Sequence, residues 1–101
     1  MSGAGEAAWL DRTYAQAASL YPRMLRPNGE RFQDAKSAGY SKAEVDAFLD
    51  RIAGYFDGKV QLTSKEVRDV VFKNAAKEKA YDEAVVDVYL DRVISVLIAV
   101  E

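Results

Sequence analysis

Hydrophobic residues recur at alternating steps of four and three in two stretches of the chain, and these stretches nearly repeat one another. The first, YSKAEVDAFLDRI, occupies residues 40–52, and the second, YDEAVVDVYLDRV, occupies residues 81–93. A four-three spacing is typical of a helix with one apolar seam, so the pattern predicts helices over about 41–57 and 82–100. The duplication predicts that both halves of the chain use one structural unit. The seam residues, expected to form a helix–helix interface, are Val45, Leu49, Ile52, Phe56, Val86, Leu90, Val93, Leu97 and Val100.

Each predicted helix start carries a capping pattern. Ser41 can cap the first helix, Glu44 completes a capping box, and Tyr40 and Val45 hold the two positions of a hydrophobic staple. The same arrangement recurs further along the chain and predicts a short helix over about 64–71. The remaining cap and staple residues are Thr63 with Glu66, and Asp82 with Tyr81.

The other segments are less regular. Apolar residues at steps of three and four predict an N-terminal amphipathic helix over about 6–21, which Pro22 should end. A turn over 26–30 and a short extended stretch through Phe32 should follow. The segment 73–80 has high helix propensity but almost no apolar stripe, so it fits either a continued helix or a solvated loop. Together these elements predict a small all-α fold in a single domain, residues 1–101.

The last predicted helix has a second apolar stripe, and a helix that is apolar on two faces needs cover on both. The N-terminal helix can supply this cover, with Trp9 and Tyr14 as its largest anchors. The alternative is that the stripe forms a seam between two chains. The stripe consists of Val85, Val88, Tyr89, Val96 and Ala99.

The composition excludes several classes of function. The chain has 101 residues, a formal net charge of −2, and neither cysteine nor histidine. Thiolate zinc sites and cysteine nucleophiles are therefore excluded, and the side chain most often used as a general base is missing. The acidic balance disfavours bulk attraction to nucleic acid. The most apolar run, residues 93–100, is too short to span a bilayer and the N-terminus has no basic leader, so we expect a cytoplasmic protein.

The repeated acids could suggest a carboxylate metal site, because Asp46 and Asp50 lie one helical turn apart. Calcium sites normally need more oxygen ligands and a glycine-bearing loop. We therefore interpret the acids as solvated or paired with Arg51 and Arg92, and we predict no catalytic, cofactor or metal site. The repeated acids are Asp46, Asp50, Asp87 and Asp91.

The repeated phrase resembles the signature of the DivIVA domain family. That signature is a Phe, a short tip, Gly-Tyr-Asp, a few polar residues and then Val-Asp-x-Phe-Leu. Here the first copy has GY at 39–40 and VDAFLDR at 45–51, and the second adds LTSKEVRDVVF at 62–72, similar to the Leu-Thr start of those domains. Small actinobacterial proteins with tandem copies are especially similar. The resemblance divides the chain into an N-terminal helix and turn (6–30), a first repeat (31–57) and a second repeat (62–101).

The resemblance implies a non-enzymatic scaffold that self-associates through a coiled coil and recruits division or wall-synthesis proteins at the septum or pole, on the inner face of the membrane. In the family a Phe-Arg pair at the tip enters the lipid, but the matching positions here are Ser37-Ala38 and Glu78-Lys79. Neither copy has the apolar wedge, so we expect protein partners rather than insertion. Weak attraction to anionic lipid, at most ~1 kcal/mol each, could come from Lys36, Lys73, Lys77 and Lys79.

We expect the two repeats to pair within one chain as a pseudo-dimer, with parallel helices that set Leu49 level with Leu90. A homodimer of such units is the alternative arrangement. The alternative function is a helical nucleic-acid-associated regulator, in which the helix over 64–71 and a following helix form a helix-turn-helix. The overall acidity counts against that function, and no small-molecule substrate is expected.

Overall fold

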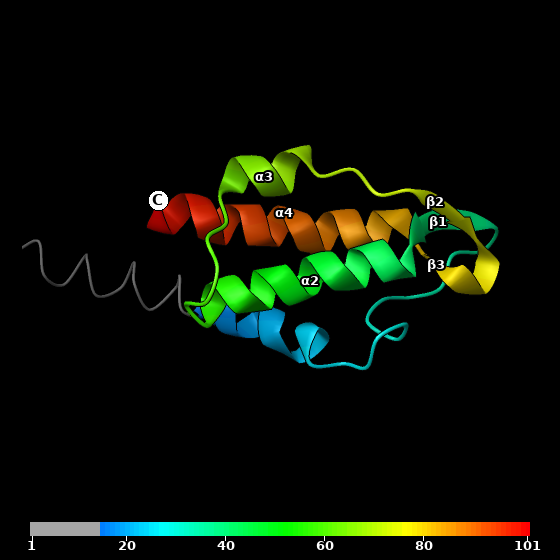
Figure 1. Cartoon of the computed structure of the whole chain (residues 1–101), viewed down its shortest axis with the longest axis horizontal. Helices are drawn as coiled ribbons and strands as arrows, with labels where there is room; N and C mark the ends of the chain where they lie inside the picture. The colour runs from blue at the N-terminus through cyan, green and yellow to red at the C-terminus, as the bar shows by residue number, and fades with distance from the viewer. Residues whose placement is uncertain (1–14) are drawn as a thin grey trace, which may run out of the picture.

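The structure is a computed structural model that describes residues 15–101 of the chain. Residues 15–24 are helical, and an irregular segment leads from them to the first strand. The elements that follow, in chain order, are β1 (Ala38–Ser41), α2 (Lys42–Phe56), α3 (Ser64–Asp69), β2 (Asn74–Ala76), a 3-10 turn (Lys77–Lys79), β3 (Ala80–Tyr81) and α4 (Glu83–Val100) (Figure 1).

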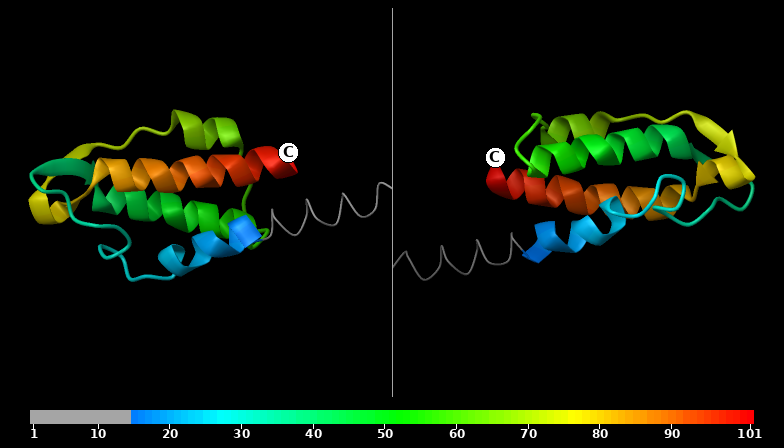
Figure 2. Two further views of the ribbon diagram at one scale, coloured as in Figure 1. Left: turned by 180° about the vertical axis from the view of Figure 1, so that it is seen from behind. Right: turned by 60° about the horizontal axis from the view of Figure 1, so that its bottom comes forward.

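Helices α2 and α4 start at the sheet and run side by side, in the same direction, to the opposite end of the molecule (Figures 1 and 2). Each helix follows directly on a strand, so the position of the strand fixes where its helix begins. The parallel direction is the one that the duplication predicts. Helix α3 packs against α4. In residues 15–101, no helix combines the length and the apolarity that crossing a membrane would require.

The core lies between α2 and α4. Val45, Leu49 and Ile52 of α2 are fully buried, as are Val86 and Val93 of α4. Complete burial of side chains of this size contributes roughly 1.5–3 kcal/mol each. The helical segment 15–24, the segment that follows it and α3 enclose this pair with further buried residues, namely Leu20, Met24, Phe32, Leu62, Val67 and Phe72.

A three-stranded antiparallel sheet in the order β2-β1-β3 closes one end of the molecule. In the pairing of β1 with β3, Tyr40 lies opposite Tyr81. Gly39 allows the close approach of these strands, because a Cβ atom at this position would lie only 2.1 Å from the carbonyl oxygen of Tyr81. The predicted all-α fold is therefore wrong, and the fold is mixed α and β.

The strands were missed for a physical reason. They are only two to four residues long and have no alternation of apolar and polar residues over a useful length. The segment 73–80, which fitted a helix or a loop, forms β2, the 3-10 turn and β3 instead. Pairing with β1 supplies hydrogen bonds that outweigh its local helix propensity.

The expected coiled coil is also wrong. A two-stranded coiled coil buries one seam between two helices, whereas here both helices also pack against residues from outside the seam. Tyr89 illustrates the difference, because its side chain is buried and its hydroxyl donates a 2.8 Å hydrogen bond to the carbonyl of Leu20. The helices therefore form the centre of a small globular core.

The predicted N-cap residues of all three labelled α-helices are confirmed. The side chains of Ser41, Thr63 and Asp82 each accept a hydrogen bond from the backbone N–H three residues later. The capping box at Ser41 is incomplete, because the carboxylate of Glu44 accepts from the N–H of Lys73 at 2.9 Å and not from Ser41. Glu44 thereby connects the start of α2 to the strand segment of the other repeat.

Two helix ends differ from prediction. The first helix continues to residue 24, beyond Pro22. Pro22 has no backbone N–H to donate, but the N–H of Leu25 still donates to the carbonyl of Tyr21 and closes the last turn. Helix α3 stops at Asp69, two residues earlier than predicted, where Val70 turns extended. The predicted anchors Trp9 and Tyr14, and the predicted start of their helix, lie outside the described residues.

Candidate functional site

The two repeats bind each other through reciprocal tyrosine–aspartate hydrogen bonds near the sheet. The hydroxyl of Tyr81, from the second repeat, donates to Oδ1 of Asp46 in the first at 2.7 Å. The hydroxyl of Tyr40, from the first repeat, donates to Oδ1 of Asp87 in the second at 2.9 Å. These four residues occupy equivalent positions in the two copies. The repeats are therefore related by an approximate two-fold operation within one chain.

Two phenylalanines extend this reciprocal packing. The Phe32 ring packs edge-on against Tyr81 and Tyr89 of the second repeat, with centroids 5.3 Å apart in both pairs. The Phe72 ring lies 5.3 Å from that of Tyr40 and 5.8 Å from that of Phe48 in the first repeat. Each repeat therefore places its phenylalanine against the tyrosine and helix of the other. Aromatic pairs of this kind add roughly 0.5–1.5 kcal/mol beyond the area they bury.

The two tyrosine–aspartate pairs lie in different environments. Asp46 is buried, and its second oxygen accepts a 2.8 Å hydrogen bond from the N–H of Gly29. The hydrogen bond of Tyr40 to Asp87 lies at the surface, with Asp87 exposed and Tyr40 half-buried. Burial, followed by the hydrogen bond to Asp46, raises the pKa of Tyr81 to about 12. Burial and the hydrogen bond to Asp87 likewise raise the pKa of Tyr40 to about 12.

Arg31 fixes the loop that buries the first pair. Its guanidinium donates to the carbonyl of Asp46 at 2.9 Å, to the carboxylate of Asp50 at 2.8 Å and to the carbonyl of Arg26 at 3.1 Å. Its backbone N–H donates to the hydroxyl of Tyr81 at 3.2 Å. Sequence reasoning missed Arg31, because nothing in the spacing of the repeats marks it. The signal for Phe32 and Phe72 was present, since each precedes the tyrosine of its copy by eight or nine residues.

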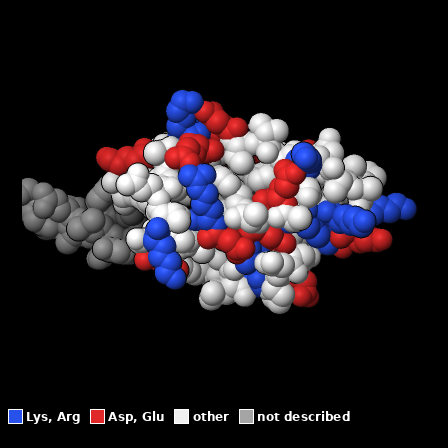
Figure 3. Space-filling view, in the orientation of Figure 1, with Lys and Arg blue, Asp and Glu red and all other residues white. Residues whose placement is uncertain are grey.

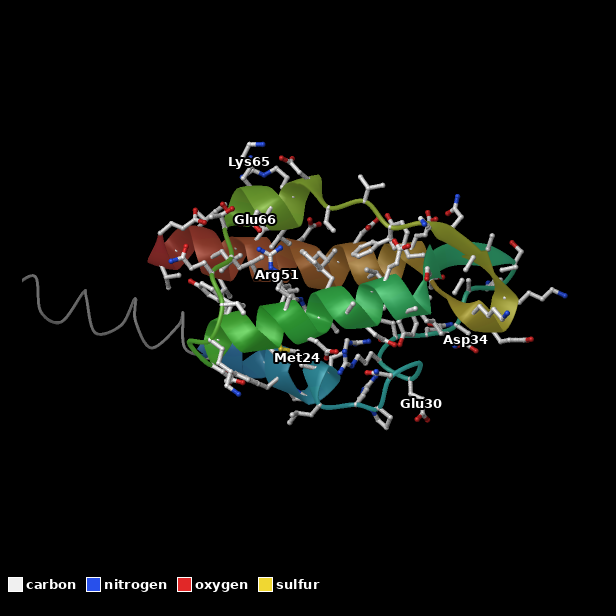
Figure 4. The ribbon with its side chains drawn as sticks, in the orientation of Figure 1. Met24, Glu30, Asp34, Arg51, Lys65 and Glu66 are labelled. Atoms are coloured by element: carbon white, nitrogen blue, oxygen red, sulfur yellow. The ribbon has the colours of Figure 1, made fainter. Side chains whose placement is uncertain are left out.

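Of the two predicted states of the repeated acids, Asp50, Asp87 and Asp91 are exposed to solvent, whereas Asp46 is buried. Among residues 15–101, none of the four pairs with Arg51 or Arg92. Arg51 forms an ion pair with Glu66 of α3, as Figure 4 shows. Asp50 pairs with Arg31 instead. Within residues 15–101, no group of three or more acidic side chains is placed to hold a metal ion.

The end of the molecule that carries the sheet exposes a surface we call the tip surface, formed by Lys36, Ser37, Ala38, Lys73 and Lys77–Lys79. All of its side chains are exposed, and it contains the positions of both repeats that the sequence resemblance matches to a tip. Figure 3 shows basic side chains gathered at this end beside acidic ones. None of its lysines forms an ion pair with a carboxylate of the described residues. The fold therefore places all four predicted lysines at the same end.

The predicted seam residues lie in the core of this chain. Those from Val45 to Ile52 and from Val86 to Leu97 are buried, and Phe56 is partly buried. Val100 is the exception, with 51% of its surface exposed. The seam is therefore filled within one chain, and association between chains would need another surface.

An open apolar groove lies at the opposite end of the helix pair. It has a volume of about 570 Å³, and its lining includes Tyr55, Phe56, Leu62 and Val96. Val60 and Val100 also line it, and 42% and 51% of their surfaces remain exposed. We call it the end groove. Residues 15–101 thus present one polar, lysine-bearing end and one apolar end.

Comparison of the sequence and the structure with protein-family models, curated proteins and solved structures found no match.

Proposed function

We propose that this protein is a non-enzymatic scaffold or adaptor module that associates with itself and recruits protein partners. The observation that carries the proposal is the reciprocal pairing of the repeats through Tyr40 with Asp87 and Tyr81 with Asp46. This pairing joins two copies of an interaction unit into one body with both tips on one surface. The resemblance to DivIVA domains supports the same function and adds the expectation of work in cell division or polar growth.

Self-association uses the end groove in this proposal, and its occupant is a second copy of the chain. The helix seam is filled internally, so the apolar surface left for association includes Val60 and Val100. Ile98, which is 56% exposed, adds to the apolar surface of the last turns of α4. Burying such side chains against the same surface of another copy would follow the usual two-fold symmetry of homodimers.

Partner recruitment uses the tip surface. The family tip positions hold Ser37-Ala38 and Glu78-Lys79, which gives polar or small side chains where an apolar wedge would enter lipid. Four lysines at ~1 kcal/mol each could add peripheral attraction to an anionic membrane, but such attraction is screened by salt. Protein partners at the septum or pole are therefore favoured over direct insertion.

The alternative of a helix-turn-helix regulator is not supported by the chain that follows α3. Residues 70–73 are not helical, and β2 comes next, so no second helix stands where a recognition helix would be needed.

Light scattering over a series of dilutions tests the self-association. We expect a particle of twice the chain mass that falls to the monomer mass on dilution, and a Val60→Glu/Val100→Glu variant that is monomeric throughout. Val71→Glu is the matched control, because Val71 is 86% exposed and does not line the end groove. Two results would overturn this part of the proposal. One is a wild-type protein that is monomeric at all concentrations, and the other is an end groove covered by residues 1–14 of the same chain.

Affinity capture tests the recruitment. We expect the wild type to capture a protein partner, and the purified partner to bind the wild type directly. The Lys36→Glu/Lys79→Glu variant should not bind this partner. Lys59→Glu, an exposed change outside the tip surface, should keep it. Equal binding by both variants, or no direct partner, would contradict recruitment through the tip.

A further inference from the structure

Strand β2 is an edge of the sheet, with no strand on its outer side in the described part of the chain. The other edge is different. Beyond β3, the N–H of Ala35 donates to the carbonyl of Ala80 at 2.9 Å, and the N–H of Asp82 donates to the carbonyl of Gln33 at 2.8 Å. Residues 33–35 therefore cover β3, and β2 is the open edge of this sheet.

The register between β1 and β2 determines which backbone groups this edge presents. The N–H of Ser41 donates to the carbonyl of Lys73 at 2.8 Å, and the N–H of Lys77 donates to the carbonyl of Ser37 at 2.8 Å, so these backbone groups of residues 73 and 77 point towards β1. Bonded and non-bonded pairs alternate along an antiparallel ladder. The N–H and C=O groups of Asn74 and Ala76 therefore point away from β1. Both residues are exposed, so their backbone groups are available to another strand.

The charge around the edge selects the kind of strand that fits. Lys73 and Lys77 flank β2, both exposed and without an ion-pair partner in the described residues. Lysines on an edge oppose pairing with the same edge of a second copy, because like charges would face each other. They favour an acidic strand by the same rule. Val71, which precedes β2 by three residues, leaves 86% of its surface exposed.

We propose that the β2 edge binds an extended, acidic peptide segment of a partner protein, which joins the sheet as a fourth strand. The inference rests on the proposed adaptor function, because it names the class of partner that the tip surface recruits. Backbone hydrogen bonds to Asn74 and Ala76 supply the affinity, and the two flanking lysines supply the selectivity.

A peptide titration of the full chain, followed by NMR, tests the inference. The probe is a six-residue peptide of alternating glutamate and valine with blocked termini. Its controls are the same peptide with lysine in place of glutamate, and the acidic peptide N-methylated at alternate residues so that one edge cannot donate. We expect the acidic peptide to shift the amide resonances of Asn74 and Ala76 and to slow their hydrogen exchange. Both control peptides should bind at least about tenfold more weakly, a difference of about 1.4 kcal/mol in binding free energy.

Variants of the protein provide the second arm. Lys73→Glu/Lys77→Glu should weaken the acidic peptide about tenfold or more and strengthen the lysine peptide, whereas Lys59→Glu should change neither. Ala76→Pro removes one outward N–H and leaves the ladder to β1 intact, so it should also weaken binding.

The inference would be overturned if the peptide affinity did not depend on peptide charge and N-methylation. It would also be overturned if the shifted amides lay outside β2, or if no peptide bound. The N-methylated peptide keeps the test decisive even if Ala76→Pro does not fold. Capture of a partner through the tip lysines, together with no peptide binding at β2, would leave the adaptor function standing and remove only this inference.

Discussion

Tyr40 and Tyr81 lie directly opposite each other in the pairing of β1 with β3, and each donates its hydroxyl hydrogen to an aspartate of the other repeat. The pairing between the two copies therefore explains why the phrase occurs twice in the chain. Each copy supplies a strand tyrosine and a helix aspartate, and each completes the pair of the other copy. The two copies pair within one chain, so this pairing does not depend on protein concentration.

The two tyrosines should contribute unequally to stability. In Tyr81→Phe the buried carboxylate of Asp46 loses its side-chain donor, so we expect a loss of about 1–3 kcal/mol in the free energy of unfolding. In Tyr40→Phe the exposed Asp87 can bond to water, so the loss should stay below about 1 kcal/mol. Urea unfolding followed by circular dichroism measures both. Equal losses would contradict the assigned difference between the two environments.

The helices could be predicted from the sequence because their signals are local. Ser41, Thr63 and Asp82 mark the three helix starts, and the four-three spacing marks the residues of α2 and α4 that enter the core. The sheet could not be predicted in this way. Its strands are too short for a periodic signal, and β1 pairs with β2 and β3, which lie more than thirty residues away. Pairing over such distances depends on the assembled fold and not on the local sequence.

The candidate site shows the same division. The identical tyrosines and aspartates of the two copies were visible, but alignment of the copies shows only that the residues recur. It does not show that Tyr81 bonds to Asp46 across the repeats rather than within its own copy. Arg31 has no counterpart in the pattern, and its role follows only from the loop that it closes.

Arg31→Met should destabilise the protein more than Asp50→Asn. The methionine removes the charge-assisted hydrogen bonds of Arg31 to the carbonyls of Asp46 and Arg26 together with the ion pair to Asp50, and hydrogen bonds from charged groups contribute about 1.5–3 kcal/mol each. Asp50 has 58% of its side chain exposed, so loss of its charge should cost at most about 1 kcal/mol. Chemical unfolding of both variants provides the comparison.

Arg31→Lys is the control for charge. A single ammonium cannot reach three acceptors in the fork geometry of a guanidinium, so the lysine should recover little of the lost stability. A lysine variant as stable as the wild type would show that charge alone, and not the hydrogen bonds to backbone, explains the role of Arg31.

Stability should fall in strongly alkaline solution because of the two paired tyrosines. Their pKa values in the folded protein are about 12, above the value near 10 expected for the unfolded chain. A raised folded pKa gives stability that is fully present below about pH 10 and is lost as the pH rises towards 12. Burial raises the pKa of Tyr89 as well, so it contributes in the same direction.

Urea unfolding at a series of pH values from 8 to 11.5, with Tyr40→Phe/Tyr81→Phe beside the wild type, isolates the paired tyrosines. The double variant should lose less stability than the wild type between the two ends of this range, because only Tyr89 and the groups common to both proteins still titrate. Parallel curves would show that the pKa values of Tyr40 and Tyr81 are not raised in the folded protein.

Gly39→Ala should separate β1 from β3. The added Cβ would lie 2.1 Å from the carbonyl oxygen of Tyr81, and a backbone atom cannot move aside as a flexible side chain could. We expect a loss of about 1–3 kcal/mol and faster hydrogen exchange at the strand amides. Gly58→Ala is the matched control, because Gly58 has a φ of +75°, open space around its Cβ position and a place beyond the end of α2 away from the sheet, so it should cost about 1–2 kcal/mol without loosening the sheet. Unchanged exchange at Tyr81 in Gly39→Ala would mean that the close strand contact does not require glycine.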